Sequence, residues 1–272
     1  MSDQSRHTLL LRLAGPLQSW GTSSRYTERD TGYEPSKSGV IGLLAASLGI
    51  PRNGDLSRLA ILTMGIRVDR EGVPGYDFQS AGAGDDHPGI AMAKDSESQI
   101  ATRQRILAAG GTLLDSQRGK SSISRRYFLQ DAVFLVGLEG DDLAYLTELD
   151  AALRAPVYPI GLGRRSYVPS VPVAMPPAEE HPTGVRENTP LIDALNAEPW
   201  PVARLSSRAI REDRKRGART RRLVLEDPNA TDGTIRIDQP IGAAFSTRVF
   251  GPRIVAFSSC EPVERGDLDA WL

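Results

Sequence analysis

The sequence predicts an α+β fold in which an antiparallel sheet carries its helices on one face. Three observations predict it: a buried strand near the start of the chain, amphipathic helices that alternate with further strands, and one long non-periodic insertion. Taken along the chain, the order is strand, helix, strand, insertion, strand, helix, strand. This order is the split βαβ arrangement of ferredoxin-like and RNA-recognition folds.

The first strand and the first helix both lie within residues 8–49. A short run of leucines closed by Gly15-Pro16 is typical of a strand that is covered on both faces. Ser36 or Ser38 is the expected N-cap of the helix, because apolar residues recur at helical spacing after it. Gly49 and the following Pro51 are expected to end the helix.

The remaining elements of the predicted sheet follow from the same patterns. Alternating apolar residues predict a second strand in 59–69, and 132–138 predicts the third. Asp141 or Asp142 is the expected cap of a second helix, whose inward leucines lie in 143–153. A fourth strand is expected at 157–160.

Residues 71–124 lack periodicity and are rich in glycine and basic residues, which indicates a functional insertion or a disordered one. A hairpin-like arm explains both its polarity and its basic residues. We expect residues 1–170 to form the main domain with this insertion. Residues 171–272 are expected to form a proline-rich crossing and a small β-rich C-terminal part, with strands at 223–225, 234–237 and 253–257.

Composition limits the classes of protein that fit. The chain of 272 residues has one cysteine, Cys260, which excludes an internal disulfide framework and a cysteine-based zinc site. We expect a cytoplasmic protein, because no segment approaches the ~20 apolar residues of a membrane span and no signal peptide is recognisable.

The formal net charge of −1 does not by itself indicate a nucleic-acid binder, but the kind of basic residue is informative. Four of the 33 basic residues are lysine, so the other 29 are arginine. Arginine suits bidentate phosphate contacts, although a GC-rich genome produces the same bias. Residues 204–222 carry nine basic and two acidic side chains, which fits either a solvated loop or a contact with a polyanion.

The start of the first helix is a candidate phosphate site. Helix N-termini carry unsatisfied N–H groups and the positive end of the macrodipole, and Lys37 lies beside two serines there. An ordinary capped helix is the alternative reading. A nucleotide-binding P-loop is excluded, because the segment lacks the second glycine of that motif.

Catalytic candidates are few. The three histidines, His7, His87 and His181, lie far apart in the sequence and have no metal-ligand spacing, and no paired carboxylates suggest metal-assisted hydrolysis. We therefore expect a binding protein without metal or cofactor. Four aromatic residues lie beside arginine or glycine at strand ends or loops, where they either stack on bases or pack partly buried. They are Trp20, Tyr26, Tyr127 and Tyr167.

Several collinear segments resemble one family. LRLAGPLQSWG (11–21), PSKSGVIGLLAASLGI (35–50) and GLGRRS (161–166) resemble the Cas-five (RAMP) family, whose type I-E members are subunits of the CRISPR surveillance complex Cascade. RYFLQDAVF (126–134) and Asp238-Gln-Pro240, with Arg248 and Arg253, agree with the same family. The insertion, the proline-rich stretch and residues 204–222 depart from the family pattern.

The resemblance implies a RAMP domain in which residues 71–124 form a long β-hairpin, the thumb. It implies a non-catalytic RNA-binding subunit that holds the 5′ handle of the CRISPR RNA and caps the backbone filament. The implied partners are the CRISPR RNA, the backbone subunit CasC, the large subunit CasA, and target DNA through the assembled complex.

Two other readings stay open. Type I-C members of the family cut repeat RNA themselves, so the first alternative is a metal-independent endoribonuclease that uses His7 or His87 with Tyr26 or Lys37. The second alternative is a protein-only scaffold.

The expected RNA contacts fall into three groups. The handle-binding face is expected to include Trp20, Gly21, Arg25, Tyr26, Ser36, Lys37, Ser38, Arg164 and Arg165. The thumb is expected to contribute Arg103, Arg105, Arg118 and Lys120, followed by Arg125 and Arg126. Arg248 and Arg253 complete the set near the C-terminus.

Overall fold

The computed structural model describes residues 5–21, 28–81, 97–110, 122–203, 211–212, 220–241 and 249–262. The chain forms two compact units. The first unit contains Met1–Ser23, Asp30–Gly75 and Phe128–Leu272, and the second contains Ser24–Arg29 and Tyr76–Tyr127. Among the residues so described, no helix has the length and apolar character that a membrane crossing requires.

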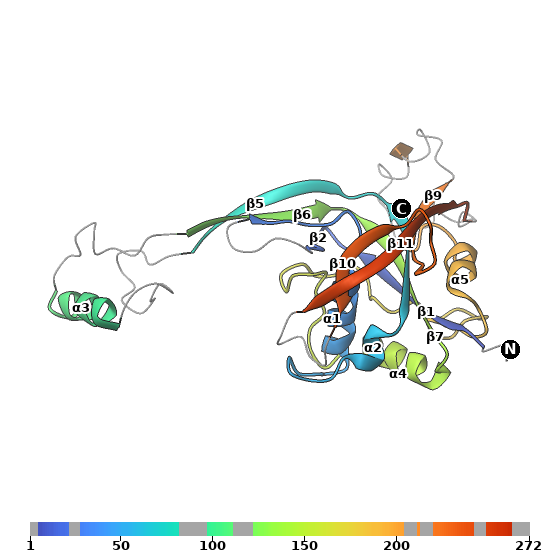
Figure 1. Ribbon diagram of the computed structural model, residues 1–272, viewed down its shortest axis with the longest axis horizontal. Helices are drawn as coiled ribbons and strands as arrows, with labels where there is room; N and C mark the ends of the chain where they lie inside the picture. Colours follow the sequence, from blue (N-terminus) through green and yellow to red (C-terminus); the bar gives the residue numbers. More distant parts are fainter. Residues whose placement is uncertain are drawn as a thin grey trace. The chain divides into compact units, whose positions relative to one another are not determined.

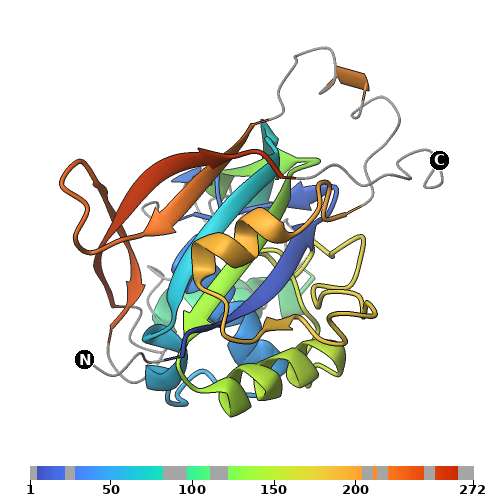
Figure 2. The same ribbon diagram turned by 90° about the vertical axis from the view of Figure 1, so that its right-hand side faces the viewer.

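A seven-stranded sheet forms the centre of the first unit, and every strand in it is antiparallel to its neighbours. In spatial order the strands are β10 (Thr234–Pro240), β11 (Phe250–Cys260), β9 (Arg221–Glu226), β4 (Thr63–Arg70), β7 (Val133–Gly140), β1 (His7–Ala14) and β8 (Val185–Arg186). Figures 1 and 2 show these strands. The predicted α+β class with an antiparallel sheet is confirmed.

The predicted helices are present with the predicted caps. In α1 (Lys37–Ser47) the Ser36 hydroxyl accepts a hydrogen bond from the Gly39 N–H, and in α4 (Leu143–Arg154) the Asp142 carboxylate accepts one from the Tyr145 N–H. Each cap satisfies a backbone donor that has no partner within the helix.

The expected fourth strand at 157–160 is wrong. The Val157 and Tyr158 N–H groups donate to the Ser47 and Ala46 carbonyls, so this segment is bound to the end of α1 and not to the sheet. Proline at 156 and 159 removes two backbone donors that a ladder needs. The edge beside β1 is taken instead by the two residues of β8.

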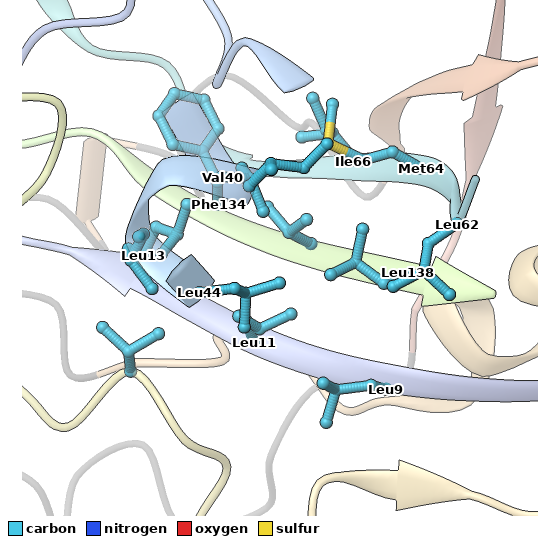
Figure 3. Packing of buried hydrophobic residues seen from close by; sticks show 14 of the residues in the cluster. Leu9, Leu11, Leu13, Val40, Leu44, Leu62, Met64, Ile66, Phe134 and Leu138 are labelled. Carbon is cyan, nitrogen blue, oxygen red and sulfur yellow. The ribbon is translucent and has the colours of Figure 1, made fainter. Parts of the chain in front are cut away.

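Side chains of alternating strand positions form two apolar cores. Leu9, Leu11 and Leu13 of β1 face α1 and α4, together with Met64 and Ile66 of β4 (Figure 3). The other face of the sheet is covered by α5 (Leu191–Ala197), which crosses β4 and β7 (Figure 2). At Gly137 of β7 a Cβ atom would lie 2.5 Å from a Leu191 methyl group, so glycine permits this close approach.

The predicted boundary near residue 170 requires the C-terminal strands to form a separate part. They do not. The three predicted strands exist as β9, β10 and β11, but β9 pairs with β4 and continues the main sheet. The division into compact units falls instead at the insertion. Which strands become neighbours in a sheet depends on tertiary packing, which the local patterns do not contain.

Two paired strands flank the insertion: β5 (Val73–Ala81) lies at its start, and β6 (Ser122–Gln130) begins at its end and continues beyond residue 124. Figure 1 shows them running side by side. Within the second unit, β3 (Glu28–Arg29) pairs with β6 in parallel. Within the first unit, β2 (Leu17–Gln18) pairs with the last residues of β6. The insertion also contains helix α3 (Glu97–Ala108), and a further short helix, α2 (Ser57–Ala60), follows α1. Neither helix was expected.

Candidate nucleic-acid interface

Two loops of the first unit meet at the end of β2. The Ser19 N–H donates to the Leu162 carbonyl at 3.1 Å. Gly163 has a φ of +84°, and a Cβ atom built on it would lie 1.7 Å from the Ser19 carbonyl oxygen. Only glycine fits this position. The close approach places the loop of Arg164 and Arg165 beside residues 19–21, as the predicted handle-binding face requires.

The two arginines of this loop differ in their surroundings. Arg165 is exposed, whereas Arg164 is half-buried and donates a hydrogen bond of 2.9 Å to the Tyr167 hydroxyl. The Arg164 guanidinium lies 5.3 Å from the centre of the Tyr167 ring. Tyr167 is buried and meets Phe128 edge to face, so it is a packing residue and not a stacking platform. These contacts orient a guanidinium at the surface of the loop.

Trp20 is also a packing residue, which corrects its expected place among the RNA contacts of the handle-binding face. Its side chain is 1% exposed, and its Nε1–H donates to the Gln18 side chain at 3.1 Å. A Cβ atom at Gly39 of α1 would lie 2.9 Å from the Trp20 ring, so the indole packs closely on the helix. The neighbouring Gly21 is exposed.

The helix start at Ser36–Ser38 is not a free phosphate site, which corrects a second expectation. The Lys37 N–H donates to the Asp238 carboxylate at 2.8 Å, so a side chain of the protein occupies the anion position at the α1 N-terminus. The Lys37 side chain is 2% exposed, and its ammonium group donates to both Glu226 oxygens at 2.9 Å. Burial lowers the pKa of Lys37, whereas the charge of Glu226 acts to raise it. The ordinary capped helix is the correct reading.

Arg253 belongs to the same buried cluster and is not available to RNA in this structure, which corrects a third expectation. Its Nε and Nη2 groups donate to the two oxygens of Asp238 at 2.6 and 3.0 Å. The side chain is 7% exposed. Arg253 therefore stabilises the carboxylate that binds the start of α1. Of the predicted residues there, Ser38 is half-buried and Ser36 is buried.

The second unit presents an aromatic face. The sequence predicted two of its four residues, Arg125 and Tyr127, but not Tyr76 and Phe78. Tyr76 and Phe78 alternate on β5, are 55% and 56% exposed, and meet edge to face with ring centres 5.3 Å apart. Tyr127 of β6 lies 5.8 Å from Tyr76, and the Arg125 guanidinium lies 5.5 Å from the Phe78 ring centre. We call Tyr76, Phe78, Arg125 and Tyr127 the aromatic face. Exposed rings beside an arginine are suited to stacking with unpaired bases.

The alternation of Tyr76 and Phe78 is visible in the sequence, and it was the signal that could have located this face. It was missed because the surrounding glycines made the whole insertion look irregular. Arg126 lies between Arg125 and Tyr127 in β6. It is half-buried, and its Nε donates to the Ser124 hydroxyl at 3.4 Å.

Other predicted contacts have a more limited structural description. Arg105 is exposed on α3, and Arg103 lies on the same helix. Several residues lie outside the described part of the chain, as does most of the basic 204–222 segment. They are Arg25, Tyr26, Arg118, Lys120 and Arg248.

Among the described residues, the histidines do not form a catalytic arrangement of the kind that an endoribonuclease needs. His7 is 7% exposed, and its Nδ1 accepts a hydrogen bond of 3.0 Å from the Asn188 N–H. His181 is exposed in a turn with Ala178, and His87 lies outside the described residues. In the part of the chain that the structure describes, no three histidine, cysteine or acidic side chains come together to hold a metal ion.

Comparison with known proteins shows which family the sequence matches. Residues 8–256 match the family described as CRISPR-associated protein (Cas_Cas5). The chain is 34% identical over 167 residues to the CRISPR system Cascade subunit CasD of Escherichia coli (strain K12). This match covers 59% of the chain and 66% of that subunit, slightly under two thirds of its length.

Two solved structures resemble the whole chain. One, described as a crystal structure of a Cas protein, is 37% identical with a TM-score of 0.62, and the match covers 95% of this chain and 98% of that one. The other belongs to a CRISPR RNA-guided surveillance complex and is 28% identical with a TM-score of 0.63, with 97% of each chain covered.

Proposed function

The chain belongs to the CRISPR-associated (Cas_Cas5) family, and from this premise we propose that it is a non-catalytic RNA-binding subunit of a type I-E CRISPR surveillance complex. In this role it holds the 5′ handle of the CRISPR RNA and caps the backbone filament next to the large subunit. CasC, CasA and, through the assembled complex, target DNA are its proposed partners. The similarity to CasD and to a subunit of a surveillance complex supports this assignment.

The strand order supports the RAMP interpretation of the fold. Strands β8, β1, β7 and β4 are consecutive in the sheet, with α1 between β1 and β4 in the chain and α4 between β7 and β8. This is the order of a split βαβ fold, with β8 in the place of the expected fourth strand. We interpret β5, α3 and β6 as the thumb.

The observation that carries the proposal beyond family membership is the aromatic face of the second unit. A contiguous patch of exposed apolar side chains often marks a binding site. RNA proteins read unpaired bases by stacking them on such rings, and arginine adds planar stacking and a phosphate contact. In our proposal, Arg164 and Arg165 of the first unit bind phosphates and thereby position the handle.

Neutralising the two loop arginines, the exposed Arg165 and the half-buried Arg164, tests the phosphate role. We expect Arg164→Gln with Arg165→Gln to weaken binding of handle RNA and to reduce the salt slope, log Kd against log salt, by about 0.7 for each phosphate that the variant no longer binds. The measurement is a salt-titrated fluorescence anisotropy assay with a labelled RNA. Arg58→Gln is the matched control, since Arg58 is also an exposed arginine, but it pairs with Asp142 on the helical side. If the double variant had the same affinity and salt slope as that control, the loop of Arg164 and Arg165 would not be part of the RNA interface.

The non-catalytic assignment has its own test. Removal of a 2′-OH proton requires a base beside the RNA, and His7 and Lys37 are buried with protein partners. We expect repeat RNA to remain intact when it is incubated with the protein in chelator. The gel is read beside a reaction with His87→Ala, which tests the histidine outside the described residues. Cleavage by the unsubstituted protein that His87→Ala abolishes would establish the endoribonuclease instead.

A further inference from the structure

A cleft of about 330 Å³ lies in the first unit between two apolar stretches of the chain. Pro156 and Ile160 belong to one stretch, residues 169–173 form the other, and Leu153 of α4 completes the lining. None of these described residues carries a charge, and Ser170 supplies the single polar side chain among them. The cleft therefore suits a flat, largely apolar group more than a phosphate.

The loop that carries Arg165 joins the two walls of this cleft. Ile160 precedes the loop and Pro169 follows it, and the Leu162 N–H donates to the Tyr167 carbonyl at 2.7 Å, which closes the loop between them. Arg165 is four residues from Pro169 in the sequence, so the backbone between them spans at most about 14 Å. The exposed Arg165 is therefore close to the cleft.

A second arginine is bound to the lining itself. Arg12 of β1 donates through Nε to the Pro172 carbonyl at 2.8 Å. The cleft thus combines an uncharged lining with arginines next to it. A nucleotide has the complementary pattern, because the flat faces of its base pack well against apolar side chains and its phosphate is anionic.

Ser170 gives the cleft a group that can read the edge of a base. Its hydroxyl donates to the Ala14 carbonyl at 3.2 Å, and its N–H donates to the same carbonyl at 2.9 Å. A hydroxyl that donates in this way keeps lone pairs that accept hydrogen bonds. Ser170 is exposed, so its oxygen is available to the amino group of a base. Adenine, cytosine and guanine carry such a group, whereas uracil does not.

We propose that this cleft receives one unstacked base of the RNA handle, an adenine, cytosine or guanine, while Arg165 binds a phosphate beside it. The inference rests on the proposed function, and it adds a subsite that distinguishes bases to a loop whose arginines bind phosphates. The apolar walls contact the faces of the base, and Ser170 accepts from its amino group. An apolar side chain of a protein partner is the competing occupant.

Ser170→Phe tests the proposal, because it fills the cleft from an exposed position. Thr147→Phe is the matched control: Thr147 is also exposed, and its hydroxyl also donates to a backbone carbonyl, that of Leu143 at 2.9 Å. At a temperature where both variants are folded, we expect Ser170→Phe to weaken binding of handle RNA by about tenfold, the effect of losing contact with one base. Thr147→Phe should leave the affinity unchanged.

Handle RNAs that lack one base at a time identify the occupant. Each handle position in turn is made abasic, and each RNA is titrated with the unsubstituted protein and with Ser170→Phe. We expect one abasic position to weaken binding to the unsubstituted protein about tenfold and to Ser170→Phe no more than about twofold, because both changes remove the same contact.

Uracil at that position should weaken binding about fivefold, the effect of one lost hydrogen bond, and Ser170→Ala should abolish this difference. If Ser170→Phe does not fold, the uracil comparison with Ser170→Ala decides the proposal.

The subsite and the proposed function fail in different ways. If the unsubstituted protein binds no handle RNA, the proposed function fails and the subsite fails with it. If the protein binds RNA but no abasic position couples to Ser170→Phe, the function stands and the cleft holds no base. If Ser170→Phe then also fails to join the assembled complex while Thr147→Phe joins it, the occupant is a protein partner and the inference is overturned.

Discussion

Lys37→Ala is expected to destabilise the protein by about 3–5 kcal/mol, the usual cost of removing one partner from a buried ion pair. The Glu226 carboxylate would lose the ammonium that it binds through both oxygens, while it remains largely buried. The measurement is the free energy of unfolding from urea titration, followed by circular dichroism. At a temperature where the variant is folded, its affinity for RNA should equal that of the unsubstituted protein.

Arg58→Ala is the control for this prediction, because the Arg58–Asp142 pair is exposed on both sides and should contribute no more than about 1 kcal/mol. A Lys37→Ala variant that kept its stability and lost RNA affinity would show that the lysine binds phosphate after all.

Tyr76→Ala with Phe78→Ala is expected to produce the largest loss of RNA binding. Stacking of a base on an aromatic ring contributes about 1–3 kcal/mol, so each ring that stacks on a base should change Kd between about 5-fold and 150-fold. Because both side chains are exposed, the melting temperature should change little. The salt slope should not change, since no charge is removed, and this separates stacking from phosphate binding.

Ile123→Ala is the matched control for the aromatic face. Ile123 is 60% exposed on β6 and is apolar, but it carries no ring. If the double variant lost no more RNA affinity than Ile123→Ala, stacking of bases on Tyr76 and Phe78 would be excluded.

The sequence was sufficient for the central elements of the first unit. β1, α1, β4, β7 and α4 follow from apolar periodicity and from caps that lie within a few residues of the elements they begin. These signals are local, and tertiary packing did not override them. The expected fourth strand failed because two prolines remove backbone donors and the segment binds the end of α1.

The candidate site was less predictable because its chemistry is decided over long distances in the chain. A helix N-terminus with a lysine and two serines has the same local sequence whether it binds phosphate or a carboxylate of the protein. Here the helix start binds carboxylates of the protein. They belong to Asp238 and Glu226, which are 201 and 189 residues away from Lys37 in the chain. The grouping of Arg164 and Arg165 with the loop after Trp20 came from the family resemblance. In the structure, Gly163 permits their loop to approach Ser19 closely.

The most direct test of the account is the binding of handle RNA. The CRISPR RNA of the host's own array would be prepared with its 5′ handle and, separately, without it, and both would be titrated with the protein across salt concentrations. We expect the RNA with the handle to bind at least about tenfold more tightly and with a steeper salt slope, because the protein binds the phosphates of the handle. Equal affinities and slopes for the two RNAs would contradict it.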